Sequence, residues 1–158
     1  MTPPVPIRPA RLADLPGIQD IITACYAPYI QQIGRRPAPM DDDYAAHIAA
    51  KQLWVAAERD KVFGLVVLVA QRNALLVDNI AVAPAAQGRG VFRTLMRFAE
   101  TIAHGQDLPA IILYTHAKMT RNLSLYPKLG YVETHHEIQS GFDRVFFRKA
   151  LTAQDDCS

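Results

Sequence analysis

The sequence has few cysteines, no long apolar run and no strong excess of charge. Its two cysteines, Cys25 and Cys157, provide no disulfide framework, so we expect a cytoplasmic protein. The N-terminal residues lack the apolar run of about 7 to 15 residues that a secretory signal requires. The longest apolar stretch, 65–70, is far shorter than the roughly 20 residues that span a bilayer. A net charge of +2 creates no strong field, so we expect a soluble protein that binds neither nucleic acid nor a membrane.

Two common phosphate-binding motifs are also missing. No G-K-[ST] sequence occurs, which excludes a P-loop. The glycine pair Gly88 and Gly90 is followed by Arg93 where the dinucleotide-binding fingerprint has its third glycine, so that fingerprint is excluded as well. A nucleotide-derived cofactor of another kind is therefore favoured, if this segment binds phosphate at all.

The segment around these glycines is nevertheless the most informative part of the chain. A β-like run breaks at Pro84, and a glycine turn then opens into a helical pattern of apolar residues that begins at Val91. Unpaired amides at a helix N-terminus, together with the helix dipole, attract anions, and Arg89 adds a positive charge. The alternative is a plain strand-to-helix connection whose glycines only make the turn. The glycines alone do not decide between these interpretations.

Length and composition predict one domain over residues 1–150 and a polar tail over 151–158. The chain has 158 residues, half of them apolar, which is enough for a continuous core. Apolar periodicity, caps and breakers predict helices and strands. The expected helices are one opened by Asp14 and ended near Pro28, then 41–50, 89–104 and 121–129. The expected strands are 5–8, 54–58, 62–70, 75–82, 110–115, 131–136 and 144–148, with 29–39 irregular.

Residues Gln87 to Phe92 fit the loop pattern Q-x-x-G-x-G/A up to their last position, and residues Asn122 to Tyr131 form the segment N-x-x-x-Y-x-x-x-G-[FY]. Together these two motifs resemble those of the GNAT superfamily of acyl-CoA-dependent N-acyltransferases. Phe92 departs from the pattern, which prefers Gly or Ala there. The resemblance implies a mixed α/β fold with a splayed, mostly antiparallel central sheet and helices on both faces. It also implies an N-acetyltransferase that moves an acetyl group from acetyl-CoA to a primary amine of a small molecule or peptide. The alternative is a non-catalytic module that binds or senses acyl-CoA.

The resemblance also implies which residues bind the cofactor, and it implies no metal. The pantetheine arm of coenzyme A would contact backbone groups of the strand before the loop, and the pyrophosphate would contact loop amides. Asn122 would help to place the arm. The pantetheine residues would be Ile80, Ala81 and Val82, and the pyrophosphate residues Gln87, Gly88, Arg89, Gly90, Val91 and Phe92.

For the chemistry, Tyr126 matches the family tyrosine that protonates the departing thiolate, and a phenol stays protonated at neutral pH. A core aromatic is the alternative role for Tyr126. The general base is open. Some relatives carry a glutamate where this chain has Tyr114, so Asp78 and His116 are the candidates, with water alone as a third possibility. Without a catalytic role, Asp78 would pair with a basic neighbour and His116 would be a solvated loop residue.

Acceptor specificity would come from the segment between Tyr26 and Tyr44, which in the family folds over the cleft. The candidate acceptor-binding residues are Tyr26, Tyr29, Met40, Tyr44 and Asn79. The aspartates at 41–43 could attract a cationic amine or could cap a helix, and the aromatic residues could instead pack on the sheet. Pairing through the last strands is a family habit, so a homodimer is also open.

Overall fold

The computed structural model describes residues 5–152, and the predictions for Cys157 and the end of the tail lie outside that range. These residues form two compact units. The first comprises 5–68 with 79–98, and the second comprises 69–78 with 99–152. No helix in the described range is long and apolar enough to cross a membrane.

Seven strands form one mixed sheet. Their order is β1-β2-β3-β4-β5-β7-β6, and all assigned pairs are antiparallel except that of β4 with β5. The parallel ladder joins residues 75–77 of β4 to residues 111–113 of β5, although β4 continues to Val82. This confirms the expected mixed α/β class with a mostly antiparallel sheet. The strands are β1 Ile7–Pro9, β2 Leu53–Glu58, β3 Lys61–Ala70, β4 Leu75–Val82, β5 Ala110–His116, β6 Val132–Gln139 and β7 Phe142–Ala150.

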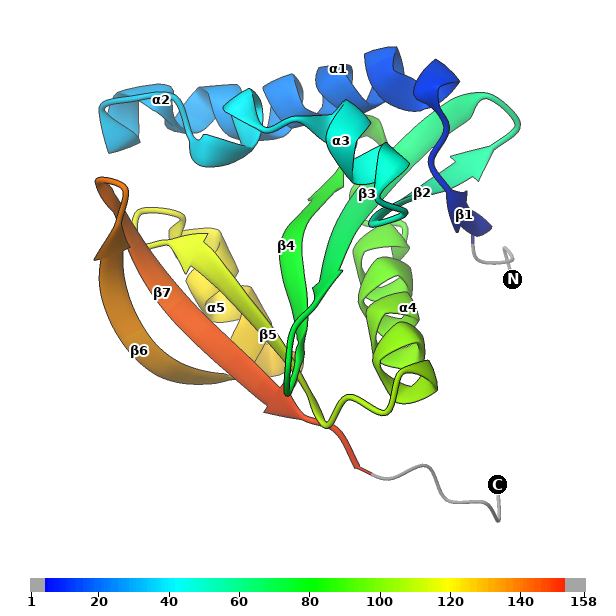
Figure 1. The fold of residues 1–158 in the computed structure, drawn as a ribbon. Coiled ribbons are helices and arrows are strands. Elements are labelled where there is room, and N and C mark those ends of the chain that lie inside the picture. The colour runs from blue at the N-terminus through cyan, green and yellow to red at the C-terminus, as the bar shows by residue number, and fades with distance from the viewer. Residues whose placement is uncertain (1–4, 153–158) are drawn as a thin grey trace. The chain divides into compact units, whose positions relative to one another are not determined.

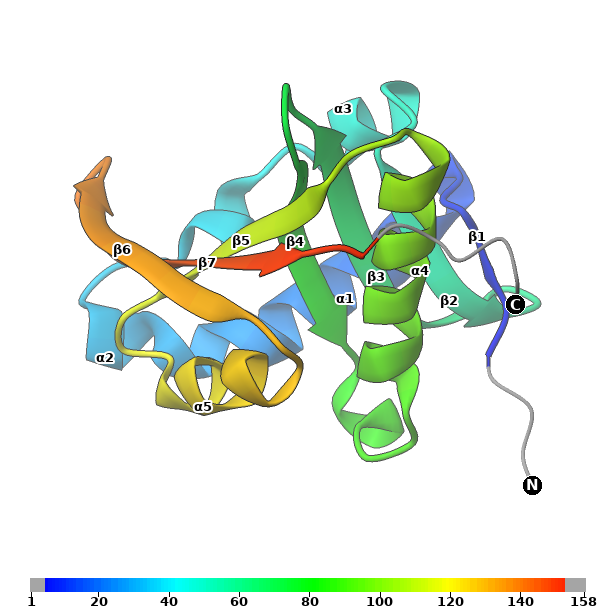
Figure 2. The same cartoon turned by 90° about the horizontal axis from the view of Figure 1, so that it is seen from below.

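The first unit packs helices on both faces of β2 and β3. Figure 2 shows α4 on one face and α1 beyond the sheet on the other. The ring of Phe98 in α4 packs 5.5 Å from that of Trp54 in β2, and α1 buries Ile18, Ile21 and Ile22 as its apolar stripe predicts. The helices are α1 Leu15–Tyr26, α2 Ile30–Ile33, α3 Tyr44–Ala49 and α4 Val91–Gly105, with single 3-10 turns at Leu12–Asp14, Ala27–Tyr29, Ala38–Asp41 and Pro84–Ala86.

Two predictions for this unit need correction. The segment 29–39 is not irregular, because it contains α2 and parts of two 3-10 turns. Asp14 precedes α1 but its side chain caps no amide of that helix. It instead accepts two hydrogen bonds from the Arg8 guanidinium, at 2.7 and 2.9 Å, and one from the Arg11 amide at 2.7 Å. A charged partner within reach outcompetes the capping role, because charge-assisted hydrogen bonds are the stronger ones.

In the second unit, α5 (Thr120–Lys128) packs against one face of β5 and β7, behind them in Figure 1. The long β6–β7 hairpin extends well beyond the predicted strands 131–136 and 144–148. Its turn residues Ser140 and Gly141 have φ of +50° and +81°, the pattern of a type I′ turn. The far end of β6, residues 137–139, was missed because the strand is exposed everywhere except at Gln139 and so has no apolar alternation that marks its full length.

Candidate active site

The glycine turn, which we define as Gln87 to Gly90, lies directly before α4. Gly88 and Gly90 both have φ of +82°, a conformation that other residues adopt only at a cost. A Cβ added to either glycine would meet no atom within 4 Å. The two glycines are therefore needed for the backbone path, and they leave open space beside the helix N-terminus.

Several backbone amides of this segment donate no hydrogen bond to any of the described residues 5–152. The first backbone hydrogen bond of α4 runs from the Thr94 amide to the Gly90 carbonyl at 3.0 Å. Within residues 5–152, the amides of Gly88, Arg89, Gly90 and Val91 donate no hydrogen bond to another residue. The Gln87 amide differs, since it donates to the Pro84 carbonyl at 3.3 Å. The open run of donors thus begins at Gly88, one residue later than the sequence motif suggests.

The end of β4 that should contact pantetheine is partly occupied. The Val82 carbonyl accepts a hydrogen bond from the Gln87 side chain at 3.2 Å and one from the Cys25 thiol, also at 3.2 Å. A carbonyl has two lone pairs, so a further donor would have to displace one of these bonds. Ile80 is half-buried, whereas Ala81 and Val82 are buried. Burial also raises the pKa of the Cys25 thiol, which keeps the thiol protonated as a donor.

In the second unit, Asn122 joins α5 to the end of β5. Its side-chain amide donates to the buried Thr115 hydroxyl at 3.0 Å. Tyr126 lies one turn further along α5 and is 4% exposed. Its ring packs edge-on against Tyr131 and tilted against Phe147, with centroids 5.8 and 5.7 Å away. Burial raises the pKa of the Tyr126 phenol well above its usual value, so the phenol carries its proton at neutral pH.

The two candidate bases differ in their surroundings. The Tyr114 hydroxyl donates to an Asp78 carboxylate oxygen at 2.9 Å, so the residue at the family's glutamate position contacts one candidate directly. His116 accepts the Lys118 amide on Nδ1 at 3.1 Å, which leaves the proton of the neutral ring on Nε2. Burial lowers the pKa of His116, so the ring is neutral at pH 7. One ring nitrogen already accepts a hydrogen bond and the other carries a proton, so neither is open to take a proton from the amine. His116 is therefore a weaker candidate than Asp78 for the general base.

In the first unit, hydrogen bonds link three of the five predicted acceptor-binding residues. The Tyr26 hydroxyl donates to Asn79 Oδ1, Asn79 Nδ2 donates to the Tyr44 hydroxyl at 3.0 Å, and Tyr44 in turn donates to the Pro39 carbonyl. Asn79 and Tyr44 are buried, at 5% and 1% exposure. This chain of hydrogen bonds ties α1, the 3-10 turn before α3, and α3 itself to β4. Tyr29 and Met40 are half-buried outside it.

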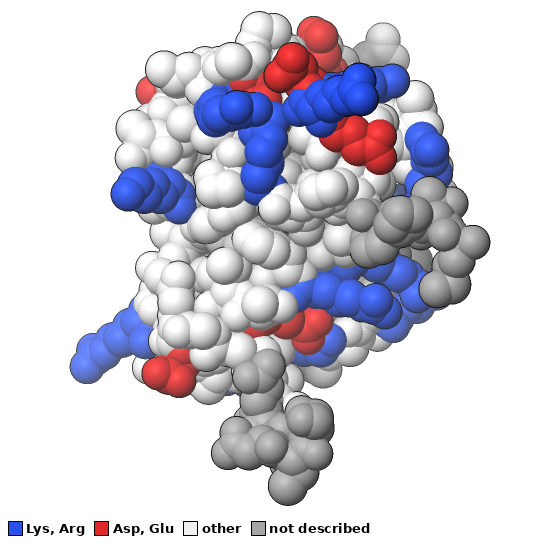
Figure 3. Space-filling view, turned by 90° about the vertical axis from the view of Figure 1, so that its right-hand side faces the viewer, with Lys and Arg blue, Asp and Glu red and all other residues white. Residues whose placement is uncertain are grey.

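The three aspartates mostly serve the local structure. Asp43 accepts the Ala46 amide at 3.0 Å and caps α3. Asp42 bonds the His47 ring at 2.8 Å, and Asp41 pairs with Arg36 at 2.9 Å. In the face of the molecule shown in Figure 3, basic side chains alternate with acidic ones and form no continuous stripe.

The sequence of residues 15–131 matches the profile of the acetyltransferase (GNAT) family. This chain belongs to that family. It is a GNAT N-acetyltransferase that uses acetyl-CoA and an amine acceptor. The identification agrees with the two motifs, since both lie within the matched residues.

Solved GNAT structures share the fold at low sequence identity. The PaiA N-acetyltransferase of Thermoplasma acidophilum in complex with coenzyme A has a TM-score of 0.69 at 18% identity, covering 92% of this chain and 98% of that one. The ribosomal-protein-S18-alanine N-acetyltransferase of Escherichia coli has a TM-score of 0.70 at 16% identity, covering 96% of each chain. An Elizabethkingia anophelis GNAT acetyltransferase with acetyl-CoA bound has a TM-score of 0.67 at 18% identity, covering 95% and 100%. No curated protein sequence matches this one.

Sequence reasoning missed Arg144 of β7, whose guanidinium lies over the Tyr114 ring, 4.4 Å from its centroid. The predicted strand began at Arg144 itself, so its alternation with Phe142 could not be seen. Had the strand been extended to 142, the alternation of Phe142, Arg144 and Phe146 would have placed all three on one face.

Proposed function

We propose that this enzyme acetylates a primary amine of a small molecule or a peptide by direct attack on acetyl-CoA, within one catalytic domain over residues 1–150. The open amides of Gly88 to Val91 at the N-terminus of α4 are the observation that carries the cofactor assignment. Such donors, with the helix dipole, suit the pyrophosphate of coenzyme A. The remaining assignments to Ile80, Ala81, Val82, Gln87, Phe92 and Asn122 follow the family motif residue by residue.

The proposed reaction needs two proton transfers. The neutral amine nitrogen attacks the thioester carbonyl carbon, the tetrahedral intermediate collapses, and the carbon–sulfur bond breaks. Tyr126 gives its proton to the departing thiolate. A base takes the proton that the attacking nitrogen loses, directly or through water, and we assign this role to Asp78 ahead of His116. The hydrogen bond from Tyr114 holds the Asp78 carboxylate in a fixed orientation, while the bonded Nδ1 of His116 argues against the ring.

Gly90→Glu tests the cofactor assignment. We expect it to abolish binding of acetyl-CoA in calorimetry, because the new side chain fills the space beside the helix N-terminus and brings a negative charge. The substitution also strains the backbone by about 1–2 kcal/mol, because φ is positive at this position.

Gly34→Glu is the matched control. Gly34 ends α2 with φ of +85° and has equally open surroundings, so both variants carry the same strain. The control should bind acetyl-CoA like the parent protein. Unchanged binding by Gly90→Glu, or equal losses in both variants, would refute the assignment.

The proposal includes a cytoplasmic setting and a homodimer paired through the last strands. The edge strand β6 supports the dimer, because Val132 and Ile138 are 68% and 73% exposed and a strand edge offers unpaired backbone groups. Light scattering on the purified protein would measure the mass. A monomer that stays monomeric at high concentration would refute the dimer.

A further inference from the structure

The cation of Arg144 is held in place by aromatic rings and a side-chain amide. Its guanidinium stacks on Tyr114 at 4.4 Å and lies 5.6 Å from the centroid of Phe142. One of its N–H groups donates to the Gln139 side chain at 2.9 Å. Within the described part of the chain, no carboxylate lies within ion-pair distance of Arg144. The half-buried guanidinium is thus fixed by rings and an amide oxygen, and its charge is available to an anionic ligand.

The carboxylates nearest in the sheet are engaged elsewhere. Glu137 stands directly opposite Arg144 in the β6–β7 ladder, but its carboxylate pairs with His135 at 3.3 Å. Asp143 precedes Arg144 in β7, and its carboxylate pairs with His136. Asp78 accepts the Tyr114 hydroxyl. Each of these carboxylates is thus bonded to a side chain other than Arg144.

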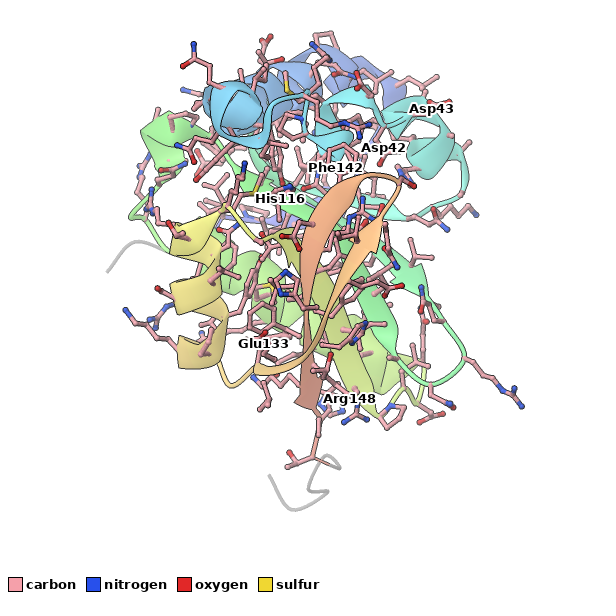
Figure 4. All side chains as sticks on the ribbon, turned by 90° about the vertical axis from the view of Figure 1, so that its left-hand side faces the viewer. Asp42, Asp43, His116, Glu133, Phe142 and Arg148 are labelled. Atoms are coloured by element: carbon pink, nitrogen blue, oxygen red, sulfur yellow. The ribbon has the colours of Figure 1, made fainter. Side chains whose placement is uncertain are left out.

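Arg144 also lies beside the residues assigned to catalysis. His116 is its register partner in β5, and Tyr114 bridges the guanidinium to Asp78 by a ring contact on one side and a hydroxyl on the other. His116 and Phe142 are labelled close together in Figure 4, with their rings edge-on and their centroids 6.2 Å apart. Burial is the main cause that lowers the pKa of His116. Of the nearby charges, Asp143 raises this pKa, and Lys118 and Arg144 lower it, so His116 senses the charge of Arg144.

We propose that Arg144 is a specificity residue that binds a carboxylate of the acceptor, so that the preferred substrate is an amine that also carries an acidic group. A planar guanidinium held on an aromatic ring presents paired N–H donors that match a carboxylate. The inference rests on the proposed function, with the amine being acetylated near Asp78. An acceptor of the amino-acid type fits this arrangement, and a polyamine without acidic groups does not.

The test compares matched acceptors, namely amino acids of two to six carbons and the corresponding amino amides, by thiol release from acetyl-CoA. We expect kcat/KM to favour the acids. Arg144→Gln should lower the ratio of kcat/KM for acid over amide by about 10- to 100-fold, the usual effect of losing a hydrogen bond to a charged group. Arg144→Lys should keep part of the preference, because the charge remains.

Arg148→Gln is the control, since Arg148 lies on the same face of β7 but is exposed and is labelled well away from His116 in Figure 4. It should leave the ratio unchanged. A preference for amides, or a ratio that Arg144→Gln does not alter, would overturn the inference while acetyl transfer itself stands. If no amine of either series releases thiol, neither series contains an acceptor of this enzyme.

If neither series releases thiol, a binding measurement still tests whether Arg144 binds a carboxylate. N-acetyl amino acids, the expected products, should raise the pKa of His116 in an NMR titration of the parent protein by neutralising Arg144. They should not do so in Arg144→Gln. Absence of the effect in the parent protein would overturn the inference.

Discussion

The hydroxyl of Tyr131 is the one buried side-chain polar atom in residues 5–152 without a hydrogen-bond partner. Tyr131 is 4% exposed, and burial raises the pKa of its phenol. A buried polar group without a partner costs about 1–3 kcal/mol. Tyr131→Phe removes this oxygen and keeps the ring contacts with Tyr126 and Lys149. We therefore expect the free energy of unfolding to rise by about 1 kcal/mol, the lower end of that range because a small void is left.

Tyr44→Phe also removes a buried phenol oxygen, but we expect it to lower the free energy of unfolding and not to raise it. The Tyr44 hydroxyl donates to the Pro39 carbonyl and accepts from Asn79, and both partners would lose their bonds inside the protein. We expect the free energy of unfolding to fall by about 2 kcal/mol. Urea unfolding measures both values, and the melting temperature should move by about 2–4 °C for each kcal/mol in a protein of this size. If Tyr131→Phe destabilises the protein as much as Tyr44→Phe does, the Tyr131 hydroxyl has a partner and the reasoning is wrong.

Two further predictions concern catalysis and pH. Tyr126→Phe should lower kcat by about 100- to 10,000-fold, the range of general acid catalysis. Calorimetry should show unchanged binding of acetyl-CoA, and a kcat close to that of the parent protein would exclude Tyr126 as the acid. The hydrogen bond from Arg8 lowers the pKa of Asp14 below its ordinary value of 3.8, so the unfolded chain binds this proton more readily. Stability from this pair is therefore complete above that value and is lost as the pH falls through the lower folded pKa. Arg8→Met should remove this acid-side part of the pH dependence of unfolding, and an unaltered profile in Arg8→Met would contradict the assignment.

Much of the fold could be predicted because its signals are local. The stripe of Ile18, Ile21 and Ile22 is visible in the spacing of apolar residues, and the glycines of the turn before α4 are visible as residues that tolerate positive φ. The long β6–β7 hairpin was underestimated because a strand exposed on both faces has no apolar alternation. The capping role predicted for Asp14 was wrong, because the Asp14 carboxylate bonds Arg8, which lies outside α1.

The sequence by itself determined the family, the type of cofactor and the position of the glycine turn, because these depend on short motifs and on backbone preferences within a few residues. The tertiary structure decided which side chains meet. Tyr114 reaches Asp78 through the strand register that joins β4 to β5, and Arg144 reaches Tyr114 through the register that joins β5 to β7. Such pairings bring together residues about 30 positions apart, and no local pattern encodes them, because sheet register depends on the packing of the whole sheet.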